Sequence, residues 1–295
     1  MEQFRTGSAI VVGVDGSKAN RDAVEWAVHE ARARYSKLLA LYAWHVPSLA
    51  YSAPGYVPIS ADETNEAGRE LLRREVLPLA QEAGLELELR SLEGPAAKVI
   101  RAAAADEQVA LVVVGSRGRG ALARLVLGSV SHGLSHNCPK PLVIVPHHEP
   151  PVAAEWPFRH IVVGIDGSDG ADAALRWAAV EASLHDAVLE VAMAWSWTTL
   201  PPGMILAEPF DESLEKSAHQ VLTEAVSKLG PTDVKIKFTV QPGSAVDVLL
   251  ESSHSADLLV VGTRGHGRAQ EMALGSTSHA CAHLSRVPVA IIPQG

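Results

Sequence analysis

An internal repeat is the feature that most constrains how this chain can fold. The segment AIVVGVDGSKANRDAVEWAVHEA at 9–31 recurs as HIVVGIDGSDGADAALRWAAVEA at 160–182. Further along, VVVGSRGRGALARLVLGSVSH at 112–132 recurs as VVVGTRGHGRAQEMALGSTSH at 259–279. Each copy is about the length of a whole domain, and far longer than the unit of a solenoid. The repeat therefore predicts two duplicated domains.

The length of the chain agrees with this division, because 295 residues are about twice the usual domain size. We place the first domain at 1–147 and the second at 158–295. The segment 147–160, HHEPPVAAEWPFRH, is polar and rich in proline, with neither a helical nor a strand period. It contains the expected linker, 148–157.

Short β-branched runs alternate with longer helical patterns in each copy. Continuous apolar runs such as IVVGV at 10–14 and LVVV at 111–114 are typical of strands covered on both faces of a parallel sheet. The order βαβαβαβαβ, with right-handed crossovers, gives an open doubly wound sheet. We therefore expect an α/β fold of two tandem doubly wound, Rossmann-like domains, each a five-stranded parallel sheet with helices on both faces.

Composition excludes several classes of partner. The formal net charge is −9 and the pI is near 5.8, so we expect no binding to nucleic acid or to an anionic membrane surface. No stretch approaches the ~20 apolar residues that span a bilayer, and the N-terminus lacks the apolar region of a secretory signal. The two cysteines, Cys138 and Cys281, occupy non-equivalent positions and form neither a disulfide framework nor a metal pattern. We expect a cytoplasmic protein.

Glycines after the fourth expected strand predict a phosphate site. Ligands of open α/β sheets bind at the carboxyl ends of strands. Both copies have the spacing G-x2-G-x9-G-[ST], in which glycines allow close approach of the backbone to a ligand. The last glycine begins a helix, where amides and the dipole favour an anion. The residues are Gly115, Gly118, Gly128, Ser129, Val130 and Ser131, repeated as Gly262, Gly265, Gly275, Ser276, Thr277 and Ser278.

The loop matches neither of the two common phosphate-binding motifs, because the chain lacks G-x-x-x-x-G-K-[ST] and has no G-x-G-x-x-G after its first strand. The spacing G-x2-G-x9-G-[ST], together with VGVDGS after strand one, resembles the ATP-binding branch of the universal stress protein family. The resemblance covers essentially the whole chain, twice, and is similar to the tandem-domain form of actinobacteria.

This resemblance implies two ATP molecules per chain, each with adenine in an apolar slot, ribose on the glycines and phosphates at the helix start. It adds Val14, Asp15 and Ala43 to the first set of residues, and Ile165, Asp166 and Ala194 to the second. Trp44 and Trp195, at the ends of the second strands, are placed to shape the adenine slot.

Two charged positions in each copy have two possible roles. Asp15 and Asp166 either cap the first helix or meet a ribose hydroxyl or a nucleotide-bound Mg²⁺, which carboxylates hold together with phosphates. Arg117 and Arg264 either bind phosphate, which suits a guanidinium, or are solvated loop charges. His266, where the first loop has Arg119, weakens the positive charge of the second loop.

Two further residue types invite a chemical interpretation. His132 and His136, and likewise His279 and His283, are four apart on one helical face, a spacing that can bind zinc. Without the Glu of H-E-x-x-H or a third ligand nearby, we expect them to pack, cap or solvate the helix. Ser129 and Ser276, with no assigned base, read as helix-start residues, so we expect no catalytic residue.

The leading hypothesis is a regulator whose conformation or partner depends on bound ATP, and the resemblance adds stress or dormancy responses as the setting. An enzyme, as a slow ATPase or phosphotransferase, is a second hypothesis, although no water-orienting residue can be named. An interaction module with structural ATP is the third. We also expect the last strands, LVIVP and VAIIP, to pair across the halves as a pseudo-twofold, and two chains to form a homodimer with an unknown regulatory partner.

Overall fold

The chain forms two compact units, Met1–Val152 and Ala153–Gly295, in a computed structural model. Both units are α/β. The structure describes residues 8–45, 60–118, 127–147, 156–195, 210–263 and 274–294.

The N-terminal unit contains a parallel sheet with the strand order β3-β2-β1-β4-β5. Its strands are β1 (Ala9–Gly13), β2 (Lys37–Trp44), β3 (Leu87–Glu93), β4 (Val109–Gly115) and β5 (Leu142–Val145). Its helices are α1 (Lys18–Ala33), α2 (Ala61–Glu82), α3 (Ala96–Ala104) and α4 (Ser129–Asn137). The strand order reverses between β1 and β4, and the carboxyl ends of these two strands are the expected ligand position.

The C-terminal unit repeats this topology with the order β8-β7-β6-β9-β10, again all parallel. Its strands are β6 (His160–Gly164), β7 (Val188–Trp195), β8 (Lys235–Pro242), β9 (Leu258–Gly262) and β10 (Val289–Ile292). Its helices are α5 (Asp169–His185), α6 (Phe210–Ser227), α7 (Ala245–Ser253) and α8 (Ser276–Leu284).

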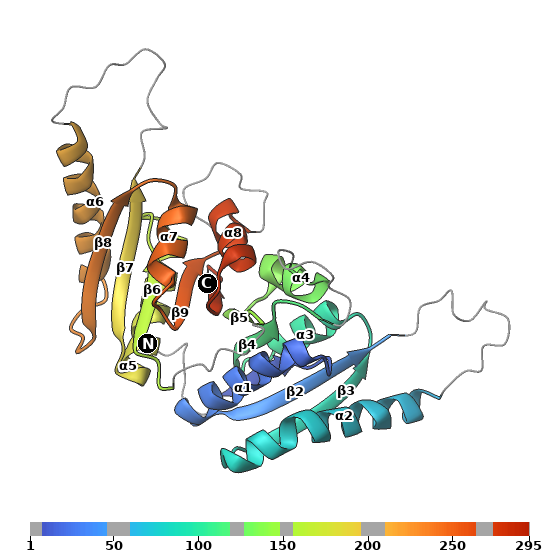
Figure 1. The fold of residues 1–295 in the computed structure, drawn as a ribbon. Helices are drawn as coiled ribbons and strands as arrows, with labels where there is room; N and C mark the ends of the chain where they lie inside the picture. Colours follow the sequence, from blue (N-terminus) through green and yellow to red (C-terminus); the bar gives the residue numbers. More distant parts are fainter. Residues whose placement is uncertain are drawn as a thin grey trace. The chain divides into compact units, whose positions relative to one another are not determined.

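Helices pack on both faces of each sheet (Figure 1). In the N-terminal unit α1 packs beside α2 and α3 beside α4, and in the C-terminal unit α5 packs beside α6 and α7 beside α8. The predicted fold class, two doubly wound domains with five parallel strands each, is therefore confirmed for the described residues.

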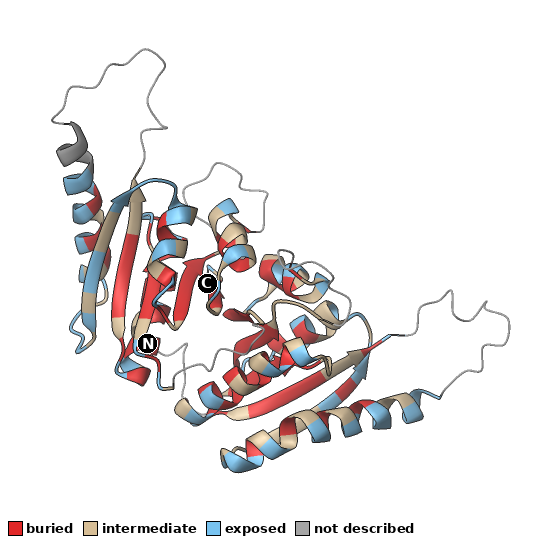
Figure 2. Cartoon of the chain, viewed as in Figure 1, coloured by how far each residue is buried: buried red, intermediate tan, exposed pale blue. Residues whose placement is uncertain are grey.

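The core of each unit lies along the central strands, as the buried residues in Figure 2 show. Val11 and Val12 of β1 and Val112 and Val113 of β4 are all fully buried, because helices cover both faces of these strands. In the outer strand β3 only Ser91 is buried, and the other residues are half-buried or exposed. None of the helices in the described part of the chain combines the length and apolarity that crossing a bilayer requires.

Candidate functional site

The turn between β1 and α1 is held by a buried asparagine. Asn20 is 5% exposed, and its Nδ2 donates to the carbonyl of Gly13 at 2.9 Å. Its Oδ1 accepts from the backbone N–H of Asp15 at 3.1 Å. The Oδ1 of Asp15 in turn accepts from the N–H of Ser17 at 2.8 Å. These bonds fix the Asp-Gly-Ser turn at the carboxyl end of β1, where a doubly wound sheet binds ligands.

The position of Asp15 bears on both of its predicted roles. The N-cap of α1 is Ser17, and Asp15 lies two residues before it. The carboxylate closes the turn by accepting from the N–H of Ser17. Asp15 also faces the loop after β4, because a Cβ added to Gly118 would lie 2.7 Å from Asp15 Oδ2. Gly118 thus lies against this carboxylate, and a side chain at this position would displace the carboxylate.

Backbone bonds draw the two ends of the loop after β4 together. The N–H of Ser116 donates to the carbonyl of Val145 at 2.8 Å, and the N–H of Gly128 donates to Ser116 O at 2.8 Å. The hydroxyl of Ser131 donates to Ser116 O at 3.1 Å and to Gly128 O at 3.0 Å. The glycine that ends β4 and the glycine that begins α4 are thereby held at one place.

The start of α4 offers amides in place of a side-chain cap. Gly128 is the N-cap, and it supplies no side-chain hydrogen bond. The first N–H groups of a helix have no partner within that helix, and the dipole makes this end positive. The amides of Ser129 and Val130 therefore present donors suited to an anion.

These segments enclose a cavity of about 110 Å³ in the N-terminal unit. All ten residues predicted for the first site line it, namely Val14, Asp15, Ala43, Gly115, Arg117, Gly118, Gly128, Ser129, Val130 and Ser131. The remaining lining is mostly apolar, from Gly13, Leu41, Ala96, Ile100 and Val114, with Asn20 as the further polar residue. A mainly apolar cavity with a few polar groups is the usual form of a small-molecule site.

Arg117 brings a positive charge to this cavity. Its Nη2 donates to the backbone carbonyl of His147 at 3.3 Å. The Nδ1 of His147 lies 2.7 Å from Asp22 Oδ2 on α1. Arg117 is therefore attached to the segment after β5, and is not simply a solvated loop charge.

The C-terminal unit has corresponding hydrogen bonds at the equivalent turns. The N–H of Ile165 donates to Ala192 O at 2.9 Å, just as that of Val14 donates to Leu41 O. The N–H of Gly275 donates to Thr263 O at 2.7 Å, and the Ser278 hydroxyl donates to Gly262 O at 2.5 Å.

The predicted residues of the second site fall at corresponding elements. Ile165 and Asp166 follow β6, Ala194 lies in β7, Gly262 ends β9, Gly275 caps α8, and Ser276, Thr277 and Ser278 form its first turn. Arg264 and Gly265 lie outside the described residues, as do His266 and Arg119.

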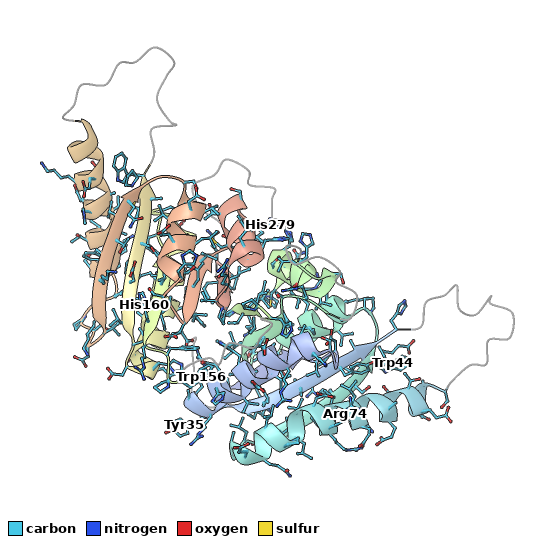
Figure 3. The ribbon with its side chains drawn as sticks, viewed as in Figure 1. Tyr35, Trp44, Arg74, Trp156, His160 and His279 are labelled. Carbon is cyan, nitrogen blue, oxygen red and sulfur yellow. The ribbon has the colours of Figure 1, made fainter. Side chains whose placement is uncertain are left out.

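One polar residue of the cavity lining, Asn20, was not predicted from the sequence. Asn20 is a buried polar residue in the first turn of α1, and its counterpart Ala171 is apolar, which hid its role in the repeat. Trp44 is not among the residues that line the cavity. Its indole N–H donates to Asn65 Oδ1 of α2 at 2.8 Å, so the tryptophan braces α2 against the end of β2 (Figure 3).

The comparisons with known proteins agree with one another. The model of the universal stress protein family matches residues 8–146 and 157–293. A universal stress protein of Mycobacterium tuberculosis is 31% identical over 318 aligned positions, covering 100% of this chain and 98% of the relative. One of Mycolicibacterium smegmatis is 29% identical, covering 99% of each chain. The crystal structure of a universal stress protein from Archaeoglobus fulgidus has a TM-score of 0.71 at 23% identity, covering 99% and 98%.

Proposed function

The chain belongs to the universal stress protein family, and on that premise we propose that its N-terminal unit binds ATP in the cavity at the ends of β1 and β4. One observation carries this proposal: the ten residues predicted from the sequence all line a single cavity. The fold brings these residues, which are scattered from 14 to 131, to the reversal point of the sheet, where open α/β sheets bind ligands.

The chemistry of the lining assigns a part of the nucleotide to each group. The apolar side chains of Leu41, Ile100 and Val114 suit the faces of adenine. The amides at the start of α4 and the guanidinium of Arg117 suit the phosphates. The cavity is smaller than the 300–1,000 Å³ typical of pockets for whole drug-sized ligands, so part of a bound nucleotide would lie outside it.

Asp15 is the residue of this site that would hold a nucleotide-bound Mg²⁺ or a ribose hydroxyl. A carboxylate is a ligand that Mg²⁺ prefers, usually together with phosphates and water. Among the residues described in the cavity lining, Asp15 is the only one that carries a carboxylate. Asp166 occupies the equivalent position and is proposed for the same role in a second site.

A regulator that responds to bound ATP fits this lining better than an enzyme. Phosphoryl transfer needs a metal site and commonly a separate residue that orients the nucleophile. If Asp15 holds the metal, the described lining leaves no second carboxylate for that task. We therefore expect ATP turnover far below the roughly 1 s⁻¹ at the slow end of typical enzymes. Turnover near that rate would favour the slow ATPase or phosphotransferase.

The first experiment identifies what the full chain binds. Protein is denatured after purification, any released adenine nucleotide is quantified, and the nucleotide-free chain is then titrated with ATP by calorimetry. We expect two sites per chain, with Asp15→Ala weakening one of them by about tenfold or more, which corresponds to about 1.4 kcal/mol. Arg21→Ala, an exposed change on α1, is the matched control. Absence of ATP binding would refute the proposal.

We propose a role in stress or dormancy responses, and a shape or partner that changes with ATP would separate such a regulator from an interaction module with structural ATP. A homodimer and the pairing of the last strands across the halves remain predictions. The molar mass of the chain in solution, measured by light scattering, tests the homodimer.

A further inference from the structure

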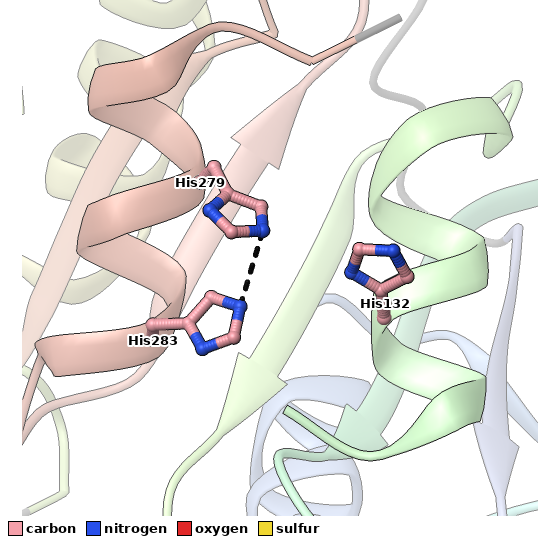
Figure 4. A group of neighbouring side chains, drawn as sticks. All are labelled: His132, His279 and His283. Atoms are coloured by element: carbon pink, nitrogen blue, oxygen red, sulfur yellow. Dashed lines mark hydrogen bonds between the residues drawn. The ribbon is translucent and has the colours of Figure 1, made fainter. Parts of the chain in front are cut away.

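Two histidines on α8 present their ring nitrogens to one another. The Nε2 atoms of His279 and His283 lie 3.2 Å apart (Figure 4). The ring centroids are 4.3 Å apart, and the ring planes are inclined at 44°. Both residues are half-buried in the first two turns after Gly275. The spacing of four residues places the rings on one helical face, but it does not require this convergence of the two nitrogens.

The separation of the two nitrogens fits a shared metal ion. Imidazole nitrogens bind Zn²⁺ at 2.0–2.1 Å, and two ligands of one ion at angles of about 90–110° lie roughly 2.9–3.4 Å apart. The observed 3.2 Å falls inside this interval. We propose that His279 and His283 form a bidentate site for one divalent transition-metal ion. Imidazole suits Zn²⁺, Ni²⁺ and Cu²⁺, with Cu²⁺ bound most tightly in the general order of affinities.

The backbone that carries the pair is already fixed. Ser278, next to His279, donates to Gly262 O, and the N-cap Gly275 is bonded to Thr263 O. Cys281, between the two histidines, is fully buried. Little backbone freedom is therefore lost when an ion binds, and the entropic cost is limited to ordering the two histidine side chains.

Solvent access decides whether water can complete the coordination of a bound ion. Both imidazoles are only half-buried, which leaves solvent access to a bound ion. A site with two protein ligands and water is open, as in exchangeable or reactive metal sites, and is unlike a closed structural zinc site.

The equivalent histidine pair on α4 is arranged differently and serves as the control for the pair on α8. The rings of His132 and His136 are 4.8 Å apart at 67°, an edge-to-face arrangement. Burial, and to a lesser extent the neighbouring His132, lowers the pKa of His136. The two pairs share residue type and spacing. His136 corresponds to His283 in the repeat and is the matched control position.

The test is a titration of nucleotide-free, tag-free full chain with Zn²⁺, because ATP itself binds divalent ions. A chromophoric chelator competes for the metal, and the tightest site is followed. We expect one such site per chain, weakened at least tenfold by His279→Ala and by His283→Ala, and changed less than twofold by His136→Ala. Equal affinity in wild type and His283→Ala would overturn the proposal, as would an equal loss with His136→Ala.

A second measurement does not depend on how the variants fold. Long-range ¹⁵N correlation spectra of the wild-type chain report each histidine ring nitrogen. With Zn²⁺, we expect the Nε2 resonances of both His279 and His283 to shift together at one equivalent of metal. Shifts confined to other histidines, or shifts of only one member of the pair, would contradict the bidentate site.

Discussion

The turn after β1 and the turn after β6 share the sequence Asp-Gly-Ser and the same backbone frame, but different side chains hold them. In the N-terminal unit Asn20 bridges Gly13 O and Asp15 N. The C-terminal unit has Ala171 at that position, and Ser168 takes over by donating to Asp166 Oδ1 at 2.6 Å and accepting from Ala171 N at 3.3 Å.

The two units also differ in how closely the first helix approaches the neighbouring strand, α1 toward β4 and α5 toward β9. A Cβ on Gly262 would lie 2.6 Å from the carbonyl oxygen of Gly170 at the start of α5. The same construction on Gly115 places the Cβ 3.6 Å from Ala19 O. The two repeats therefore share one backbone arrangement but differ in spacing. The turn after β1, which contains Asn20, is wider, and the turn after β6 is tighter. The proposed nucleotide sites should respond differently to the same substitution.

The first helices of the two units also differ in their buried ion pairs. In α1, Arg34 Nε lies 2.5 Å from Glu30 Oε1, and both side chains are at most 4% exposed. The equivalent pair in α5 is Glu181 and His185, 3.9 Å apart and at most 2% exposed. His185 also packs on Phe158, with ring centroids 4.4 Å apart.

The largest expected effect comes from breaking the buried pair of α1. Arg34→Ala leaves the Glu30 carboxylate buried without its guanidinium, which costs about 3–5 kcal/mol of stability. Chemical denaturation of the full chain, followed by circular dichroism, measures the loss. Arg21→Ala breaks a pair of the same i,i+4 spacing in the same helix, 2.8 Å apart but exposed, and should cost less than about 1 kcal/mol. Equal costs for the two variants would contradict the role given to burial.

The next effect tests the tighter packing of the C-terminal turn. Gly262→Ala forces a methyl group against the backbone of Gly170, which cannot swing aside, so we expect a destabilisation of about 3 kcal/mol. Gly115→Ala meets its nearest backbone atom, Arg117 O, at 3.3 Å and should cost less. Thermal unfolding of the two variants measures the difference, and the reverse order would refute the comparison.

Removing the asparagine should cost about 2 kcal/mol. Asn20→Ala leaves the buried Gly13 carbonyl and the Asp15 amide without their partner, and each such group is expensive to bury unpaired. Because Asp15 lines the proposed site, ATP affinity should fall as well. Denaturation and ATP calorimetry on the same preparation check both expectations. Unchanged ATP binding with reduced stability would confine Asn20 to a structural role.

The smallest effect separates the two serines of the turns. Ser168→Ala removes the cap of α5 and should cost about 1 kcal/mol. The buried Ser17 hydroxyl has no hydrogen-bond partner within the described part of the chain, so Ser17→Ala should change stability by less than about 0.5 kcal/mol. Thermal shifts of the two variants, measured side by side, test this difference; a larger cost for Ser17 would contradict it.

Much of this architecture can be read from the sequence, because it depends on local pattern. Apolar runs such as 10–14 predict buried strands, and the glycine spacing predicts residues that converge at the end of β4. The role of Asn20 was not predictable, because it depends on the distance between the start of α1 and the end of β1. The hydrogen bond of Trp44 was not predictable for the same reason, since its partner Asn65 comes from a distant helix.

The convergence of His279 and His283 likewise depends on rotamers, which a spacing of four residues leaves open. Periodicity therefore places residues on a face, and tertiary packing decides what their polar atoms meet.

ATP calorimetry on the wild-type full chain and on Gly118→Ala tests the central claim most directly. The added methyl group would lie 2.7 Å from Asp15 Oδ2 and must displace the carboxylate at the cavity, while the C-terminal unit is untouched. We predict two ATP per chain in the wild type and one in Gly118→Ala, with the thermal stability of the nucleotide-free chain nearly unchanged. Two sites of unaltered affinity in the variant, or none in the wild type, would contradict ATP binding at this cavity.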